Sequence, residues 1–291
     1  MAIMTIETEQ GLGWTKVKQI STTSSDKGNE RGRTMEDTYM GKDGLLHCKK
    51  CGEAIERILN VPLVGERKVR FLCSCRVAEE KAFEERMKQE DLERRRSICF
   101  GPALKLKDTR FENCEENEVI KIAKNYADNF KEFYKEGKGL LFHGTVGNGK
   151  SSAAACIANQ LLEEGHRVHM TDFSTAANKI QSTFDGKQAY INDLCKYSLL
   201  IIDDLGIERQ SEFMQEIVYS IINARYQSGK PFIITTNLPI NEIKKTDEAG
   251  KGRVYDRILE RCHPVHVQGQ SYRRKKVVED FTQTEMKLKG N

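Results

Sequence analysis

Short apolar runs alternate with amphipathic stretches from about residue 109 onward. Five of the runs are predicted as strands, at residues 140–142, 167–170, 199–202, 232–236 and 264–267. Helical periodicity separates them and is clearest at residues 212–227. Strands that are apolar throughout, with helices between them, indicate a parallel sheet covered on both faces. The pattern therefore predicts an α/β domain over residues 109–291.

The pattern is different upstream of residue 109. Residues 1–43 are rich in Thr, Ser, Gly and mixed charge without a sustained period, which predicts a flexible N-terminal segment. Residues 44–76 hold four of the nine cysteines and are predicted to form a small separate domain. Residues 77–108 begin with a run dense in Glu, Lys and Arg that lacks helix breakers, which predicts an exposed helical linker.

Composition narrows the class of protein. The hydrophobic fraction of 38% suffices for a packed core, but the apolar runs are too short to span a membrane, so no membrane partner is expected. The N-terminus lacks the pattern of a signal peptide. Nine cysteines without such a signal favour reduced thiols or a bound metal in a cytoplasmic protein. The net charge of +4 permits binding to nucleic acid without requiring it.

A glycine-rich loop follows the strand predicted at residues 140–142 and precedes an Ala-rich helix at 152–162. Its eight residues fit the pattern G-x-x-x-x-G-K-[ST] and are Gly144, Thr145, Val146, Gly147, Asn148, Gly149, Lys150 and Ser151. The glycines let the backbone point its N–H groups at phosphate oxygens, and the helix N-terminus adds positive charge. We expect Lys150 to reach the outer phosphates, Ser151 to bind Mg²⁺, and Ser152 to belong to the same site. The loop predicts binding of a nucleoside triphosphate.

Polar side chains end two other predicted strands. Asp203 and Asp204 follow the apolar run at 199–202, at the sheet edge where open α/β folds bind ligands. Asp203 is expected to hold Mg²⁺ through water, and Asp204 to act as the general base on the attacking water. Asn237, with Thr236 as the next candidate, is expected to orient that water. The alternatives are acidic residues that only cap a strand end and an Asn that only begins a turn.

These elements together resemble the AAA+ ATPases. The stretch 111–273 is similar to the DnaC/DnaI-type replicative helicase loaders and the related IstB-like transposition helpers, through residues 144–151, 199–206, 234–237, 252–257 and 271–273. The resemblance implies that Arg257 is an arginine finger reaching the nucleotide of a neighbouring subunit and that Arg253 lies at the same interface. It also implies that Arg273 is a second sensor contacting the γ-phosphate. Surface ion pairs are the simpler alternative for each arginine.

Two features depart from the wider AAA+ class. The general-base position is usually Glu, whereas this chain has Asp204, whose shorter side chain predicts slow or partner-dependent hydrolysis. Only 18 residues follow Arg273. We therefore expect a fold without the full helical lid, which is a trait of the helicase loaders.

The four cysteines of residues 44–76 occur as Cys48-x-x-Cys51 and Cys73-x-Cys75. Each pair is close enough to share one tetrahedral metal, and four thiolates favour Zn²⁺. His47 is a weaker substitute ligand, and reduced cysteines in a small apolar patch are the alternative without metal. A zinc-bearing N-terminal domain resembles the DnaI branch of the loaders, where that part contacts the helicase.

Single-stranded DNA is a second ligand that the resemblance implies. A group of basic and aromatic residues after the strand at 167–170 has suitable chemistry, namely Lys179, Phe184, Lys187 and Tyr190, although such residues also form ordinary helix surfaces and cores. The resemblance implies an ATP-dependent loader of the replicative ring helicase that self-associates through its ATPase domain. An IstB-like transposition helper, a nucleotide-gated adaptor with little hydrolysis, and a phosphotransferase are the alternatives.

Overall fold

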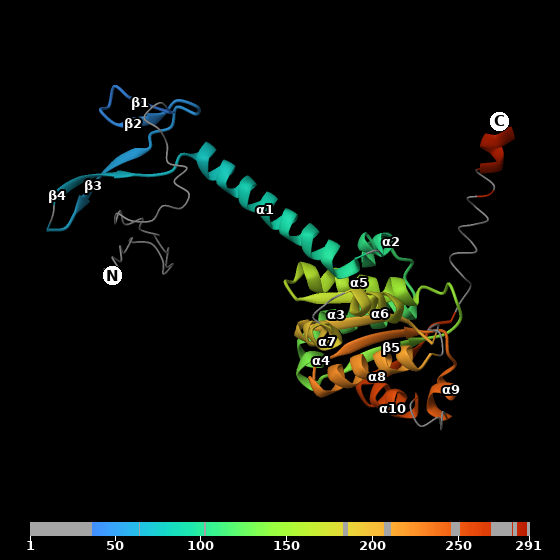
Figure 1. Ribbon diagram of the computed structural model, residues 1–291. Helices are drawn as coiled ribbons and strands as arrows, with labels where there is room; N and C mark the ends of the chain where they lie inside the picture. The colour runs from blue at the N-terminus through green and yellow to red at the C-terminus, as the bar shows by residue number, and fades with distance from the viewer. Residues whose placement is uncertain are drawn as a thin grey trace. The chain divides into compact units, whose positions relative to one another are not determined.

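The computed structural model describes residues 37–63, 65–101, 103–182, 186–206, 211–245, 251–268, 281 and 284–289. The chain divides into two compact units, Met1–Ala82 and Phe83–Asn291 (Figure 1). The described residues leave out most of the predicted flexible segment and most of the stretch after residue 268. They also leave out two residues named above, Phe184 and Arg273. The expected absence of a helical lid falls outside the described residues as well.

A five-stranded parallel sheet organises the larger unit. The strands are β5 (Gly139–His143), β6 (Val168–Asp172), β7 (Leu199–Leu205), β8 (Phe232–Thr236) and β9 (Cys262–His266). They lie in the order β6-β7-β8-β5-β9, and every neighbouring pair is parallel. The phosphate-loop strand β5 therefore lies between β8 and β9. This arrangement confirms the predicted α/β class.

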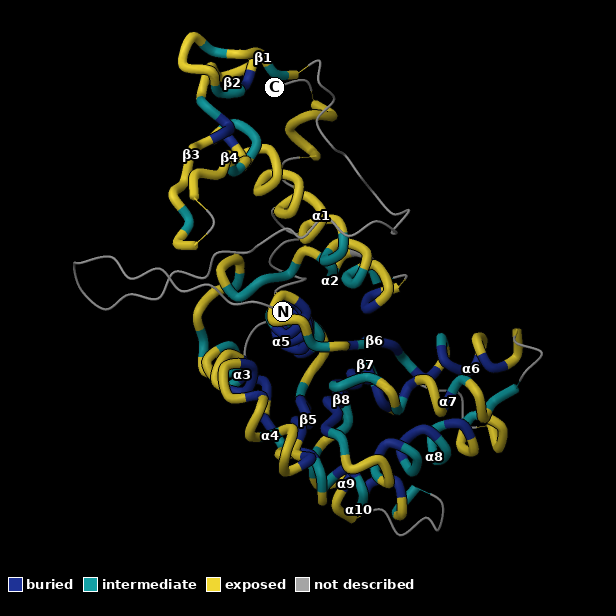
Figure 2. The backbone as a smooth tube through the Cα atoms, turned by 90° about the vertical axis from the view of Figure 1, so that its left-hand side faces the viewer, coloured by how far each residue is buried: buried dark blue, intermediate teal, exposed yellow. Residues whose placement is uncertain are grey.

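Two hydrophobic clusters cover the two faces of the sheet. Side chains alternate between them along each strand: Leu140 and Phe142 belong to one cluster, and Leu141 belongs to the other. The first cluster is completed by α3 (Glu118–Asp128), α4 (Phe130–Glu136) and α5 (Lys150–Glu163), and the second by α6 (Phe173–Ser182), α7 (Gly186–Lys196), α8 (Glu212–Gln227), α9 (Ile240–Lys245) and α10 (Lys251–Arg261). Figure 2 shows α5 and much of the sheet as buried. Burial on both faces explains why the strands are apolar throughout.

Three further segments precede α3 in the chain. Helix α1 (Ser74–Phe100) is mostly exposed, and only its last two residues, Cys99 and Phe100, are buried, against the first hydrophobic cluster. Ion pairs one turn apart, such as Arg95 with Asp91 at 2.9 Å, run along its surface. The short helix α2 (Leu104–Lys107) and the 3₁₀ turn η2 (Phe111–Asn113) then lead to α3. The charged run of the sequence is thus a helix.

The smaller unit contains two antiparallel strand pairs. β1 (Thr38–Met40) pairs with β2 (Leu46–Cys48), and β3 (Glu56–Val61) pairs with β4 (Gly65–Arg70). Among its described residues the buried hydrophobic side chains are Cys48, Ile55 and Cys73. A cluster of this size cannot stabilise a fold by burial alone, since a small two-stranded sheet is marginal in water.

A buried arginine joins α8 to three other elements of the larger unit. Arg225 of α8 is fully buried, and its guanidinium donates hydrogen bonds to the carbonyl oxygens of Tyr197 (2.8 Å), Ser198 (2.9 Å) and Pro231 (2.6 Å), with a longer one to Leu194 (3.5 Å). Burial lowers the pKa of Arg225 to about 10, so the side chain stays charged at neutral pH. It joins α8 to the end of α7 and to the segments that enter β7 and β8.

We predict that Arg225→Met lowers the free energy of unfolding by at least about 3 kcal/mol, because each buried carbonyl oxygen left without a donor costs about 1–3 kcal/mol. Urea denaturation followed by circular dichroism measures the loss. The matched control is Arg86→Met on the exposed part of α1, which should change stability by less than about 0.5 kcal/mol. A loss below about 1 kcal/mol for Arg225→Met would contradict the assigned role.

Candidate functional site

The phosphate loop connects β5 to α5 and depends on backbone conformations that favour glycine. Gly144, Gly147 and Gly149 have φ angles of 145°, 89° and 92°. At Gly144 the backbone also passes close to the end of β9, because a Cβ atom there would lie 2.3 Å from the carbonyl oxygen of Val267. Gly149 is the N-cap of α5, so the N-terminus of that helix opens directly onto the loop.

Asn148 connects the phosphate loop to the residue that follows β9. Its side-chain amide donates to Thr145 Oγ1 at 2.7 Å and to the carbonyl oxygen of Val267 at 3.4 Å. The Val267 N–H in turn donates to the carbonyl oxygen of His143 at 2.8 Å. The sequence motif includes Asn148 only as a variable position, so these hydrogen bonds could be recognised only in the tertiary structure.

Lys150 and Asn237 meet at the centre of the site. The Lys150 ammonium is buried and donates to the carbonyl oxygens of Gly144 (2.9 Å) and Thr145 (2.8 Å) and to Asn237 Oδ1 (2.7 Å). Asn237 directly follows β8, and the parallel register of β5 and β8 brings the two strand ends level. The predicted phosphate-binding lysine and the predicted water-orienting residue are therefore neighbours.

Ser151 and Asp203 meet in the same way. The Ser151 hydroxyl donates to Asp203 Oδ1 at 2.8 Å, and the same carboxylate oxygen accepts a hydrogen bond from Thr235 Oγ1. A hydroxyl and a carboxylate together are the oxygen ligands that Mg²⁺ prefers, beside substrate phosphates and water. These two residues can therefore hold Mg²⁺ next to the phosphate loop.

Asp204 lies at an irregularity of the sheet. Its φ angle of 59° is in the left-handed region, which costs a residue with a Cβ atom roughly 1–2 kcal/mol. Its backbone N–H donates to Thr235 Oγ1 at 2.9 Å. The side chain is half-buried at the carboxyl edge of the sheet, beside the residue that can hold the metal. Sequence reasoning found both aspartates but did not find Thr235.

His143 is a second residue that sequence reasoning missed. It ends β5, and its buried ring stacks on that of His266 with centroids 4.8 Å apart and planes 3° apart. Burial, followed by the nearby charges of His266, Lys244 and Lys150, lowers the pKa of His143 below its ordinary value. The ring is therefore neutral at pH 7 and adds no positive charge beside Lys150.

The predicted interface arginines lie on α10. Arg253 is exposed. The Arg257 guanidinium lies over the ring of Tyr219, 5.1 Å from its centroid, and 5.8 Å from that of Tyr226, both on α8. These contacts hold Arg257 against α8 at the surface of its own chain.

The residues considered for DNA binding lie on α6 and α7. Lys179 is exposed, whereas Lys187 forms an ion pair with Glu216 at 2.5 Å. Tyr190 packs against the second hydrophobic cluster, and burial raises its pKa. Helix surface and core packing therefore account for the contacts seen at Lys187 and Tyr190.

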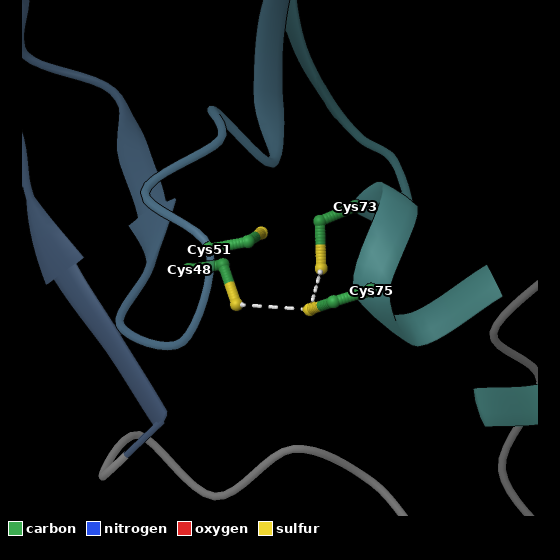
Figure 3. A group of neighbouring side chains, drawn as sticks. All are labelled: Cys48, Cys51, Cys73 and Cys75. Carbon is green, nitrogen blue, oxygen red and sulfur yellow. Dashed lines mark hydrogen bonds between the residues drawn. The ribbon is translucent and has the colours of Figure 1, made fainter. Parts of the chain in front are cut away.

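The four predicted zinc ligands come together in the smaller unit. Their ligand atoms all lie within 4.8 Å of one another, and Cys75 Sγ is 3.7 Å from Cys48 Sγ and 3.2 Å from Cys73 Sγ (Figure 3). Thiolates bound at about 2.3 Å to a tetrahedral zinc ion stand about 3.8 Å apart, so the cluster fits Zn²⁺. A hydrogen bond from the Cys51 backbone is the main cause that lowers the pKa of Cys48 to about 6, whereas a hydrogen bond with the Cys73 thiol is the main cause that raises the pKa of Cys75 to about 12.

His47 is not in this cluster. Its Nε2 is 3.0 Å from Asp43 Oδ2, and its Nδ1 is 2.9 Å from the carbonyl oxygen of Gly52. The imidazole instead supports the turn that carries Cys48 and Cys51. The arrangement favours the four-cysteine set over the substitute ligand.

We predict that Gly144→Ala weakens ATP binding at least about tenfold, which is about 1.4 kcal/mol, because the added methyl group must displace the loop from Val267. Gly165→Ala is the matched control. Its φ of 90° also lies in the positive range that residues with a Cβ atom rarely adopt, but nothing lies within 4 Å of the added Cβ atom. Titration with a fluorescent ATP analogue should give the control wild-type affinity within about twofold. Equal affinities for the two variants would contradict the assigned close approach.

Among the described residues no helix combines the length and apolar character needed to cross a bilayer.

Residues 70–279 match the family described as IstB-like ATP binding protein. The chain is 29% identical to the replicative helicase loader DnaC of Escherichia coli K12 over 144 residues, 46% of this chain and 58% of DnaC. It is 31% identical over 148 residues to a putative insertion sequence ATP-binding protein of Sinorhizobium fredii, 50% of this chain and 49% of that protein. The chain thus spans about half the length of the curated relatives it matches.

Solved structures share the fold. The crystal structure of the DnaC helicase loader superposes with a TM-score of 0.50 at 24% identity, covering 56% of this chain and 99% of that one. The crystal structure of DnaI gives 0.50 at 20% identity, covering 58% and 96%. The family match extends over most of the chain and includes the phosphate loop and the strand ends described above. The chain therefore belongs to the IstB-like ATP-binding family and shares the fold of the DnaC helicase loader.

Proposed function

We propose that this chain is an ATP-dependent helicase loader, which binds the replicative ring helicase and single-stranded DNA and hydrolyses ATP during the initiation of DNA replication. The observation that carries the proposal is the assembled set of contacts around the phosphate loop, Lys150 with Asn237 and Ser151 with Asp203. Similarity to DnaC supports the choice of the helicase as partner.

The geometry supports a definite role for each side chain. The N–H groups of residues 144–151 and the Lys150 ammonium would bind the β- and γ-phosphates. Ser151 and Asp203 would hold Mg²⁺, which neutralises charge on those phosphates. Asp204 would accept the proton of the attacking water, and Asn237 would orient that water.

The two arginines of α10 would act between subunits. Arg257 would reach the γ-phosphate bound to a neighbouring copy, with Arg253 at the same interface. A guanidinium suits this task because its planar fork matches phosphate oxygens and spreads its positive charge over them. Arg273 would contact the phosphate from within its own subunit. Hydrolysis would then require self-association through the ATPase domain.

The smaller unit would bind the helicase. Large hydrophobic side chains are concentrated at its surface, namely Tyr39, Met40, Ile58, Leu59, Leu63, Phe71, Leu72 and Val77. Exposed apolar side chains of this size are suited to contact with a partner protein. Zn²⁺ bound to Cys48, Cys51, Cys73 and Cys75 would hold this surface in shape.

An IstB-like transposition helper is the second candidate. The 31% identity to the insertion sequence ATP-binding protein favours it, whereas the four-cysteine cluster favours the loader. A nucleotide-gated adaptor is the third, because Asp204 has a shorter side chain than the usual glutamate. All three share the nucleotide site and differ in the partner and in the need for hydrolysis.

We predict that the purified chain loads a hexameric replicative helicase onto closed circular single-stranded DNA coated with single-strand-binding protein, measured by helicase retained on the DNA. Lys150→Ala should abolish loading because it removes the charge that binds the outer phosphates. Lys121→Ala on the exposed face of α3 is the matched control and should load normally.

Each outcome of this assay selects a candidate. Equal loading with Lys150→Ala, or with no added chain, contradicts the loader. Stimulation of strand joining by a transposase, without helicase loading, favours the transposition helper. Full loading by Asp204→Asn, with wild-type nucleotide affinity, favours the adaptor.

We predict one zinc per chain after purification without chelators, measured by plasma mass spectrometry, and its loss in Cys73→Ser. Structural zinc commonly supplies about 10–16 kcal/mol of apparent binding free energy, so the smaller unit should unfold without it. Cys114→Ser, which changes a cysteine outside the cluster, should retain the metal. Helicase binding should fall with zinc loss while ATP binding stays unchanged. Wild-type protein without zinc would contradict the assignment.

A further inference from the structure

One extra residue interrupts the pairing of β7 with β8. Ile202 pairs with Ile234, and the next pair is Leu205 with Thr236. Two residues of β7 but only one residue of β8 therefore lie between these consecutive pairs. The extra residue lies at the two aspartates, and the left-handed φ of Asp204 belongs to this bulge. A bulge removes ladder hydrogen bonds and re-aims the side chains beside it.

The Thr235 hydroxyl lies where the pairing of β7 with β8 is interrupted. The residue is fully buried and lies on β8 between the two paired residues that flank the bulge. Its oxygen accepts the Asp204 N–H at 2.9 Å, and its proton is donated to Asp203 Oδ1. A hydroxyl has one proton to donate and two lone pairs, so both bonds can form at once, with fixed directions.

Packing does not require this hydroxyl. The two preceding residues of β8, Ile233 and Ile234, are apolar and equally buried, and valine would match the shape of threonine at the next position. A buried hydroxyl is retained without cost only where it is hydrogen-bonded, and here both of its bonds go to the aspartate pair.

The bonds at Asp203 also determine the direction of its carboxylate. Ser151 Oγ and Thr235 Oγ1 both donate to the same oxygen, Oδ1, which orients the second oxygen, Oδ2. The hydrogen bond from the Asp204 N–H to Thr235 Oγ1 holds the Asp204 backbone in its left-handed conformation. In that conformation the Asp204 side chain projects from the edge of the sheet. One side chain thus connects the proposed metal ligand to the proposed base.

We infer that Thr235 is a positioning residue for ATP hydrolysis, which orients Asp203 toward Mg²⁺ and Asp204 toward the attacking water. The inference rests on the roles proposed above for the two aspartates. Thr235 acts through them and has no role in holding the nucleotide itself. Its loss should therefore reduce turnover and the response to Mg²⁺ more than it reduces affinity for ATP.

The test compares Thr235→Val, Thr235→Ser and Thr171→Val in the full-length chain. Thr235→Val removes both hydrogen bonds and keeps the shape, whereas Thr235→Ser keeps the hydroxyl. Thr171 is a matched control, because it is a buried threonine of β6 whose hydroxyl donates to the carbonyl oxygen of Asp172. The measurements are kcat, the KM for ATP, the Mg²⁺ concentration for half-maximal turnover, and the affinity for a fluorescent ATP analogue without Mg²⁺.

We expect Thr235→Val to lower kcat, and to raise the Mg²⁺ concentration required, by about 10–100-fold, the usual effect of removing a partner of a metal ligand. Affinity for the analogue without Mg²⁺ should change less than about threefold, and Thr235→Ser and Thr171→Val should stay within about threefold of wild type in kcat. Wild-type kcat in Thr235→Val, equal loss in Thr235→Ser, or a parallel loss of analogue affinity would overturn the inference.

The Lys150→Ala variant distinguishes failure of the inference on Thr235 from failure of the proposed function. If wild type and Lys150→Ala turn over ATP equally, the proposed site is wrong irrespective of Thr235. In that case the Mg²⁺ dependence of analogue binding tests the orientation of Asp203 alone: a shift of about tenfold in Thr235→Val supports that orientation, and wild-type dependence overturns the inference.

Discussion

The parallel register of three adjacent strands is the constraint on which the nucleotide site depends. β5 pairs with β8, and β8 pairs with β7, so the carboxyl ends of all three meet at one edge of the sheet. Lys150 donates to Asn237, which follows β8, and its neighbour Ser151 donates to Asp203 near the end of β7. No single element could gather them, because each strand contributes only one or two polar side chains.

Local strain accompanies this arrangement. Gly144 passes too close to Val267 for any side chain, and Asp204 adopts a left-handed conformation at the bulge. Such conformations persist only where the surroundings hold them. Here the surroundings are rigid: α5 is buried along most of its length, Asn148 joins the loop to the end of β9, and a buried hydroxyl accepts the Asp204 N–H.

The two units are stabilised by different means. The larger one has a sheet with a hydrophobic cluster on each face, and burial of apolar surface is its main source of stability. The smaller one has three buried hydrophobic residues among those described, and two of them are cysteines of the cluster that fits a metal. Metal binding and folding are therefore expected to be one process in the smaller unit. Its exposed hydrophobic side chains then remain available for a partner.

The sequence by itself determined the class of fold, the phosphate loop, the polar strand ends and the cysteine pairs. These features are local: an apolar run, a glycine spacing or a pair of ligands can be recognised within about ten residues. The roles of Thr235, Asn148 and Arg225 came only from the tertiary structure. Their partners lie 31, 119 and 28 residues away, at Asp204, Val267 and Tyr197. The role of a buried polar side chain depends on the hydrogen-bonding groups that the fold places beside it. The order of the strands in the sheet determines which groups these are.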